Sequence, residues 1–284
     1  MKVDKFRTVI IYIIIILLGL VCLLPLLNIV AISFSSSAAA EGTMLGLIPV
    51  GLSTGACGKI LGASQCWHSF LISVERVVLT LIINFVLIVL MAYPLSKTNA
   101  QFRGRNIYAN LMIFAMLFNG GMIPTFLLVK SYGLLNTVWA LVLPGAVPIF
   151  NVILVMNFFA AVPKELEEAA FIDGANPLQV LTKIFIPISK PVLATVSLFS
   201  IVGSWNDFYS GLIYMSKAAY YPLMTYIQSL QINVEDLIKQ GNLSAVVDSA
   251  SLGNTNLNAA KIVIAVIPLL LIYPLLQRYF VSGI

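Results

Sequence analysis

The chain has 284 residues, of which 60% are hydrophobic and only 10% are charged, and its mean hydropathy is +1.00. Soluble domains carry about 25% charged residues, so this composition excludes a soluble globular protein and predicts an integral membrane protein. The net charge of +5 then concerns topology and anionic lipid. No basic cluster interleaved with aromatic residues indicates a nucleic-acid partner.

Six stretches reach the roughly 20 apolar residues that a transmembrane helix requires. They are Thr8–Ile32, Val77–Ser96, Ile107–Val129, Val138–Ala160, Pro191–Ser216 and Ala259–Gln277. The first is too long for a signal-peptide core and has no small-residue cleavage site close behind it, so we expect a retained span. The predicted fold class is therefore all-α, with six transmembrane helices.

The Lys and Arg residues set the expected orientation, because cytoplasmic loops are richer in them. With a cytoplasmic N-terminus, ten of the sixteen basic residues lie inside and six outside. Both termini are then cytoplasmic, and the long loops Ser33–Phe70 and Lys217–Asn258 face outward. The chain divides into an N-terminal helix with an extracytoplasmic loop (1–69) and a core (70–284) that carries a cytoplasmic loop at 161–190.

Proline and glycine predict breaks within the spans. The prolines are Pro25, Pro124, Pro144, Pro148, Pro268 and Pro274. Kinks at these positions suit a pathway that opens and closes, but proline is also simply common in membrane helices. Asn119 precedes Gly120, Gly121 and Pro124, so we expect the third span to be broken or kinked there.

Asp207 is the only acidic residue inside the six expected spans. An intramembrane carboxylate is a functional-site hypothesis by default. It lies roughly 24 Å along its helix from Pro191, in the outer half of the bilayer. Trp205, Asn206, Asp207 and Tyr209 combine ring faces with amide and carboxylate groups, which suits sugar rings and hydroxyls. The alternative is that Asp207 bonds backbone or a neighbouring helix as a structural or gating element.

Three asparagines are further polar positions within spans: Asn84, Asn119 and Asn157. Asn84 and Asn119 are candidates to line a translocation path. Hydrogen bonding between helices is the alternative for each of them.

The cytoplasmic loop 161–190 carries signals for two short helices. Pro163 is suited to start the first, and Gly174 is placed to end it as the left-handed residue beyond the last turn. The carboxylates of Glu165, Glu167 and Glu168 complement the dipole of the opening turns. One face of this helix is expected to hold Leu166, Ala169, Ala170 and Asp173.

The second short helix is expected to be capped by Asn176, to begin at Pro177 and to stop at Pro187. Its apolar face is expected to hold Leu178, Leu181, Ile184 and Phe185. The loop is therefore predicted to be ordered, and to offer a small-residue face flanked by carboxylates that a cytoplasmic partner could bind.

The same loop resembles the EAA loop of importer-type ABC permeases. The matching residues are Glu168-Ala169-Ala170, Gly174 and Ile184-Phe185-Ile186-Pro187, with Ile186 where the family usually has Leu. The strings FRGR, GLLNT, PKELEEAAFIDGAN and SWNDF resemble the second, maltose-type permease of the carbohydrate-uptake branch. GGMIPTFLLVKSYGLLNT is similar to permeases for complex oligosaccharides or polysaccharides. The resemblance covers roughly Phe70–Phe280.

The resemblance implies a type I ABC importer permease in the inner or cytoplasmic membrane, surrounded by lipid. Its partners would be a homologous second permease, an ATPase dimer and an extracytoplasmic solute-binding protein. The loop would dock in a cleft of the ATPase, with Glu168 facing a basic group. The coupling residues implied are Glu168, Ala169, Ala170, Asp173, Gly174, Ile184 and Pro187.

The sequence lacks the motifs of an enzyme. GLSTGACGK superficially resembles a phosphate-binding loop, but Ser53 replaces the required glycine and Ile60 follows Lys59 in place of Ser or Thr. No metal-binding or catalytic-triad pattern is present. We therefore expect no cofactor on this chain, and ATP and Mg to be used by the partner ATPase.

The cysteines leave one alternative open. Cys57 and Cys66 share the outward loop and could form a disulfide or remain free thiols, and Cys22 is expected to pack within a span. His68 is expected to be an interface residue, not a ligand.

Other functions are weighed against the carbohydrate permease. An ABC permease for another solute class is the first. A stand-alone secondary transporter would show inverted repeats and several intramembrane charges. This chain shows one intramembrane carboxylate and no convincing repeat.

Overall fold

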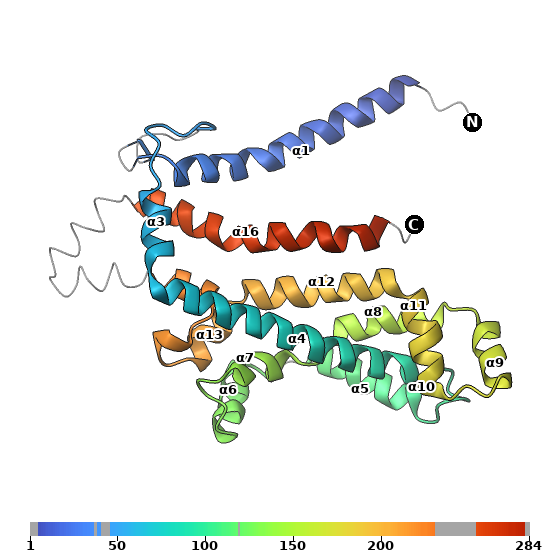
Figure 1. Cartoon of the computed structure of the whole chain (residues 1–284). Helices are drawn as coiled ribbons and strands as arrows, with labels where there is room; N and C mark the ends of the chain where they lie inside the picture. Colours follow the sequence, from blue (N-terminus) through green and yellow to red (C-terminus); the bar gives the residue numbers. More distant parts are fainter. Residues whose placement is uncertain (1–4, 37–38, 41–45, 119, 231–253, 282–284) are drawn as a thin grey trace. The chain divides into compact units, whose positions relative to one another are not determined.

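The computed structural model of the chain describes residues 5–36, 39–40, 46–118, 120–230 and 254–281 (Figure 1). Over these residues the chain forms helices joined by turns, and it forms no strand. This confirms the predicted all-α class.

The helices follow one another in a simple order. The first half contains α1 (Lys5–Ser33), α3 (Gly55–Gly62), α4 (Ser64–Ser96), α5 (Arg105–Leu117), α6 (Met122–Ser131), α7 (Val138–Val142), the 3-10 turn η1 (Leu143–Gly145) and α8 (Ile149–Ala160). The second half contains α9 (Lys164–Ile172), α10 (Pro177–Val180), the π-helical η2 (Leu181–Phe185), α11 (Ile186–Ile188), α12 (Lys190–Asn206), α13 (Tyr209–Tyr214), the 3-10 turn η3 (Ala218–Tyr220) and α16 (Asn254–Val281).

By length and composition, three of the described helices can cross a membrane unaided: Thr8–Ser33, Ser64–Ser96 and Thr255–Pro274. Three further crossings are possible if a bent pair of helices counts as one span. These pairs are Arg105–Leu117 with Met122–Ser131, Val138–Gly145 with Ile149–Ala160, and Pro177–Ile188 with Lys190–Asn206. The described helices therefore allow three to six spans, and the six predicted spans fall at the upper end.

Glycine and proline account for two of the breaks. The predicted break in the third span is confirmed: α5 ends at Leu117, and α6 begins after Gly121, whose φ of 90° is a conformation that glycine adopts without strain. Asn119 itself lies outside the described residues. The fourth span bends by 48° between η1, which contains Pro144, and α8, which follows Pro148.

Helix α4 begins at Ser64, although the sequence reading placed the start of this span at Val77. Hydropathy ended the span at the charged pair Glu75 and Arg76. In the structure Ser69, Ser73 and Arg76 are buried, so these polar residues belong to the inward face of the helix. The expected outward loop Ser33–Phe70 therefore contains α3 and the first turns of α4.

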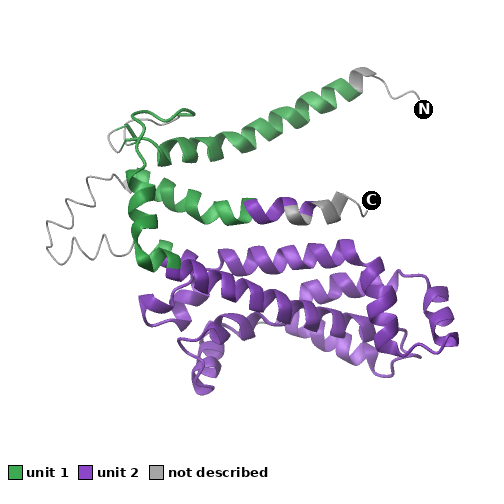
Figure 2. Cartoon of the chain, viewed as in Figure 1, with its two compact units in different colours: residues 1–67, 227–270 green, residues 68–226, 271–284 purple. Residues whose placement is uncertain are grey.

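The described chain separates into two compact units, shown in Figure 2. Unit 1 comprises residues 1–67 and 227–270. Within it the Asn256 side chain donates hydrogen bonds to the backbone oxygens of Ile32 (2.9 Å) and Ser35 (2.5 Å), which joins the start of α16 to the end of α1. Cys57 and Cys66 are buried free thiols, and burial raises the pKa of the Cys57 thiol.

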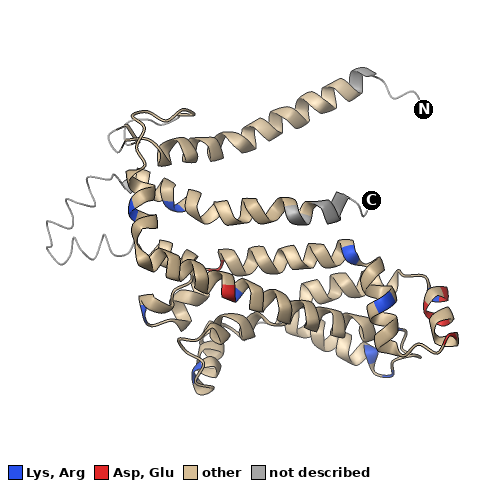
Figure 3. Ribbon diagram, viewed as in Figure 1, with Lys and Arg blue, Asp and Glu red and all other residues tan. Residues whose placement is uncertain are grey.

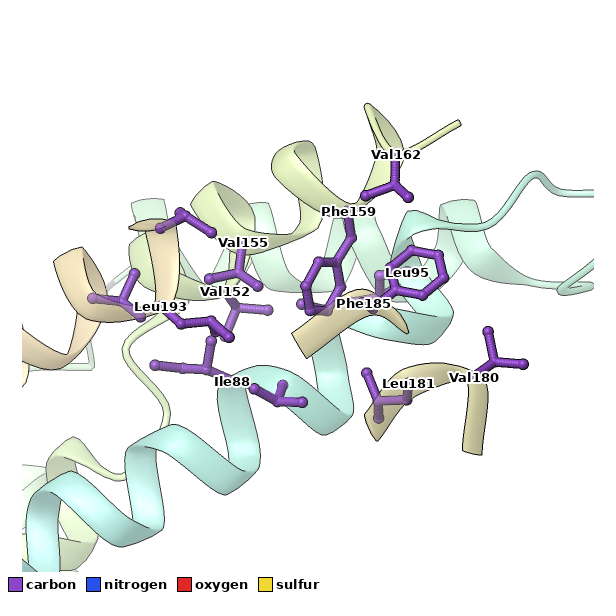
Figure 4. Close-up of a cluster of buried hydrophobic side chains, with 14 residues drawn as sticks. Ile88, Leu95, Val152, Val155, Phe159, Val162, Val180, Leu181, Phe185 and Leu193 are labelled. Carbon is purple, nitrogen blue, oxygen red and sulfur yellow. The ribbon is translucent and has the colours of Figure 1, made fainter. Parts of the chain in front are cut away.

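Unit 2 comprises residues 68–226 and 271–284 and holds the larger apolar core. Side chains from α4, α8, α12 and the loop segment α10–η2 meet there (Figure 4). Phe185 of η2 contacts the rings of Tyr93 and Phe159 edge-on, at centroid distances of 5.1 and 5.3 Å. The second half of the loop 161–190 is thus packed into the helix bundle, and this packing positions the site described next.

Candidate functional site

The first loop helix, α9, has the ends that the sequence predicts. It follows Pro163 and ends at Ile172. The amide of Gly174 donates to the oxygen of Phe171 (3.0 Å), and the amide of Ala175 donates to that of Ala170 (2.9 Å). These two bonds form a Schellman motif, which requires the left-handed conformation that Gly174 adopts at φ 79°.

The second loop helix is capped as predicted but does not end as predicted. Asn176 and Gln179 form a reciprocal capping box, each side chain accepting a 2.9 Å hydrogen bond from the other's backbone amide. Pro187 was expected to stop the helix. Instead α10 continues through η2 into α11, and Pro187 lies one residue before the end of this helical run at Ile188. The chain turns only at Ser189, with a bend of 84° before α12.

The loop exposes a mixed apolar and acidic surface. Ile172 is 87% exposed and Leu178 is 62% exposed, and the other large exposed apolar residues are Leu166, Phe171 and Ile188. Leu178 was expected to pack with Leu181 and Phe185, but only the latter two are buried. The exposed carboxylates are Glu165, Glu168 and Asp173, and Figure 3 shows the acidic residues gathered on α9.

The motif residues are divided between this surface and the bundle. Those that are exposed are Glu168, Ala169, Asp173, Gly174 and Pro187, and those that are half-buried are Ala170 and Ile184. Ala170 and Ile184 pack against the core of unit 2. The motif therefore presents most of its residues outward.

Glu167 is the carboxylate that α9 directs inward. It is the buried residue of that helix, and its two oxygens accept hydrogen bonds from the Nζ of Lys97 at 2.6 and 2.7 Å. The sequence reading grouped Glu167 with its neighbours as partners of the helix dipole and missed this ion pair. The available signal was the i, i+3 spacing to the small residue Ala170, which places both on one helix face.

A second ion pair lies at the break after α12. Asp207 was expected within a continuous helix, but α12 ends at Asn206 and Asp207 is extended (ψ 98°) before α13 begins. The guanidinium of Arg76 pairs with the Asp207 carboxylate and donates to the Asp207 backbone oxygen at 2.9 Å. The same carboxylate accepts from the Ser210 amide at 3.1 Å. One aspartate thus connects α4 to the break and caps the start of α13.

A polar cavity of about 260 Å³ lies beside this pair, between α4, the α7–η1 segment, α8 and α12. Its polar lining consists of Arg76, Thr80, Asn84, Asn151, Ser200, Ser204, Asp207 and Ser210. The Asn84 side-chain amide and the Ser200 hydroxyl are hydrogen-bonded at 3.2 Å. Arg76 Nε and Thr80 Oγ1 are buried without a hydrogen-bond partner in the described part of the chain. Buried polar groups need partners, so this cavity is suited to water or to a hydroxyl-bearing ligand.

The sequence of the chain matches a known family of membrane transport proteins. Residues 73–284 match the model of the binding-protein-dependent transport system inner membrane component. The chain belongs to this family. It is therefore a multi-pass membrane component of an ABC transporter.

Individual relatives cover almost the whole of this permease. Protein LplC of Bacillus subtilis is 39% identical over 93% of this chain and 88% of its own. The polygalacturonan/rhamnogalacturonan transport system permease protein YtcP of the same organism is 38% identical over 99% of this chain and 96% of its own. A solved chain of a bacterial ABC transporter involved in alginate import superposes with a TM-score of 0.83, at 31% identity, over 99% of this chain and 98% of that one.

The permease places the predicted pathway residues in different surroundings. Asn84 and Asp207 line the polar cavity, whereas Trp205, Asn206 and Tyr209 do not. Trp205 is buried against Phe70, and the Tyr209 hydroxyl lies 3.1 Å from the sulfur of Met122. Arg76 and Thr80 were not among the predicted pathway residues, and Arg76 was expected outside the second span, on the outward side. Their spacing of four residues, with Asn84 four further on, was the signal for one helix face.

Proposed function

We propose that this chain is a permease subunit of an ATP-driven importer for oligosaccharides or polysaccharides. The observation that carries the proposal is its near full-length similarity to a permease named for polygalacturonan and rhamnogalacturonan transport. The superposition on a chain of an alginate importer supports the same substrate class. In this proposal the subunit forms half of the translocation pathway with a homologous second permease and receives cargo from an extracytoplasmic binding protein.

The loop 161–190 is the docking element for the ATPase in this proposal. Large apolar side chains exposed beside carboxylates mark a protein-interaction surface, because water is a poor environment for them. Ile172 and Leu178 would be covered by the ATPase cleft, and exposed Glu168 would meet a basic group there. Inward-facing Ala170 and Ile184 would pass loop movement to the bundle.

The chemistry of ATP hydrolysis belongs to the partner in this proposal. This chain carries no phosphate-binding loop in its sequence. ATP and Mg are used by the ATPase dimer, and the permease converts the closure of that dimer into movement of helices. The chain itself binds no cofactor and is not an enzyme.

The polar cavity contributes to the sugar path in this proposal. Its amide, hydroxyl and carboxylate groups match the hydrogen-bonding chemistry of saccharide hydroxyls, and two of its polar atoms have no described protein partner. Asn84 and Asp207 are the sequence-predicted residues that this role retains. Trp205, Asn206 and Tyr209 do not line the cavity, so in this proposal they belong to other parts of the sugar path. Asn119, which lies outside the described residues, stays a candidate residue of that path.

Affinity purification of the tagged chain tests the coupling role. Glu168→Lys should lose the co-purifying ATPase and the ATP-dependent uptake, because it places a like charge against the expected basic group. Glu165→Lys is the matched control, since it makes the same change at another exposed position of α9. If Glu168→Lys retains both ATPase and uptake, the loop is not the docking element.

The substrate class is tested on the cognate binding protein. Galacturonate and guluronate oligosaccharides and neutral glucans are titrated by calorimetry, and the ligands that bind are then tested for uptake into proteoliposomes. Binding of any oligosaccharide with ATP-dependent uptake supports the proposal. Binding confined to amino acids, ions or other small solutes contradicts the carbohydrate assignment and leaves the family membership intact.

A further inference from the structure

The ion pair between Lys97 and Glu167 has a closed geometry. Lys97 directly follows the last residue of α4, and Glu167 lies at the start of α9. The two Nζ–oxygen distances are 2.6 and 2.7 Å, and the side chains are only 12% and 11% exposed. Charge-assisted hydrogen bonds of this length are among the stronger polar contacts in proteins.

Aromatic rings enclose the same ammonium group. Lys97 Nζ lies 4.1 Å from the ring centroid of Tyr93 and 4.3 Å from that of Phe185. A cation at this distance from a ring is attracted by the electron-rich ring face. Tyr93 belongs to α4 and Phe185 to η2. The Lys97 side chain therefore joins three segments: the end of α4, the first loop helix and the second loop helix.

Helix α9 depends on this contact more than its neighbour does. The segment α10–η2 is held by the buried apolar residues Val180, Leu181 and Phe185. The described buried residue of α9 is Glu167, while Ala170 is only half-buried. A buried ion pair adds little to the net free energy of unfolding. Removing one partner nevertheless destabilises the protein strongly, because the other charge stays buried without a partner. Such a contact fixes a position more than it adds stability.

Helix α4 extends from this contact to the second ion pair. It is continuous from Ser64 to Ser96, so Arg76 lies roughly 30 Å along the helix from Ser96 at 1.5 Å per residue. At that end Arg76 pairs with Asp207, which follows α12. Helix α4 is thus joined at two points, Arg76 and the residue after its last turn, to the segment that begins with the loop.

We propose that Lys97 and Glu167 form a latch that makes α4 follow α9 when the ATPase displaces the loop. The two are positioning residues: Glu167 is turned away from the partner, which leaves Glu168 exposed for it. This inference rests on the proposed docking role of the loop. Neither Lys97 nor Glu167 belongs to the motif, and the latch gives both of them a role in coupling.

The latch can be tested by measuring the distance between α9 and the end of α4 in the intact transporter. Spin labels are placed at Asn99→Cys and Lys164→Cys, two exposed positions outside the proposed docking residues, after the exposed Cys22 is replaced by serine. With the native latch, the distance distribution should be narrow and should not change when ATP is added. Lys97→Gln should broaden it without ATP and widen it further with ATP.

Charge exchange separates a positioning role from a general loss of structure. Lys97→Arg should retain the narrow distribution, because it keeps a cation beside the two rings. The double variant Lys97→Glu with Glu167→Lys should restore it in part, because the ion pair returns but a carboxylate then faces the rings. Lys183→Gln is the matched control, because it removes an exposed lysine of the same loop. If Lys97→Gln does not assemble, recovery of assembly in the exchanged pair decides the question. Failure of the exchanged pair and of Lys97→Arg together contradicts the latch.

Coupling is the second readout. Lys97→Gln should retain the co-purified ATPase and its basal hydrolysis but lose about tenfold in ATP-driven uptake, within the range of allosteric coupling. An unchanged distance distribution together with unchanged uptake overturns the latch and leaves the proposed function standing. If Glu168→Lys retains coupling while the distance still depends on Lys97, the docking role fails and the latch remains only a loop contact.

Discussion

Two ion pairs connect α4 to the segment from α9 to α13, and they are built differently. At the loop, the ammonium of Lys97 is surrounded by the Glu167 carboxylate and two rings. At the break after α12, the guanidinium of Arg76 holds both the carboxylate and the backbone oxygen of Asp207. Arg76 still leaves its Nε without a described partner, beside a polar cavity.

The difference follows from the chemistry of the two cations. Lysine is a compact point charge that two oxygens and two aromatic faces can enclose. Arginine offers a planar fork that binds two acceptors at once and still has a donor to spare. The loop contact is therefore closed and suited to transmit position. The contact at the break is open on one side and suited to meet a polar ligand or water.

A large loss of stability is expected at the open contact. Arg76→Leu leaves the Asp207 carboxylate without its cation, and removing one partner of a buried pair costs about 3 kcal/mol at the lower end of the usual range. The lower end applies because the Asp207 side chain is 29% exposed. The thermal unfolding temperature of the purified transporter should fall accordingly. Arg76→Lys is the control, and it should lose less because it retains the charge.

Equal losses in Arg76→Leu and Arg76→Lys would show that the fork geometry, and not the charge, holds the break. If neither Arg76→Leu nor Arg76→Lys changed the unfolding temperature, the distinction between the open and closed contacts would be lost. Lys97→Gln provides the comparison at the closed contact, in the same unfolding measurement.

The two ion pairs mark the limit of what the sequence could show. The caps of both loop helices were predictable because Pro163, Gly174 and Asn176 act on their immediate neighbours. The break near Gly121 was predictable for the same reason. Lys97–Glu167 and Arg76–Asp207 join residues 70 and 131 positions apart. Local spacing indicates which helix face holds Glu167 or Arg76, but it does not identify the partner, because tertiary packing decides which residues meet.

The hydropathy pattern also predicted the wrong surroundings for two charged residues. Arg76 was expected just outside the second span, on the outward side, although it is 3% exposed within α4. Asp207 was assigned to the interior of a helix, although it lies at a helix end. The two charges are accommodated together, because Arg76 and Asp207 form an ion pair with each other. A hydropathy window adds values that are assigned to each residue separately. It therefore does not detect a buried charge that an oppositely charged partner stabilises.

A smaller effect tests how tightly the break is packed. A Cβ added at Gly211 would lie 2.1 Å from Thr225 Oγ1, and the Thr225 side chain is fully buried and donates to the Phe208 oxygen. Overpacking of this kind costs about 1 to 3 kcal/mol. Gly211→Ala should therefore lower the unfolding temperature, as measured on the purified transporter.

Gly174→Ala is the matched change at the loop. No atom lies within 4 Å of the added Cβ there, so the cost is limited to the left-handed backbone at φ 79°, about 1 to 2 kcal/mol. A larger loss at Gly174 than at Gly211 would reverse the contrast between a tightly packed break and an open loop. Equal losses would show that packing at Thr225 relaxes more readily than its burial indicates.

The smallest effect on stability is expected on the exposed loop surface. Leu178→Ser removes a side chain that is 62% exposed, and surface substitutions usually stay within about 0.5 kcal/mol. The same change should nevertheless weaken binding of the ATPase, which is measured by its yield in affinity purification. Leu181→Ser is the opposite case, because Leu181 is buried in the core and its loss should lower stability first. If Leu178→Ser reduced stability as much as Leu181→Ser, the exposed surface would belong to the fold of this chain and not to its interface.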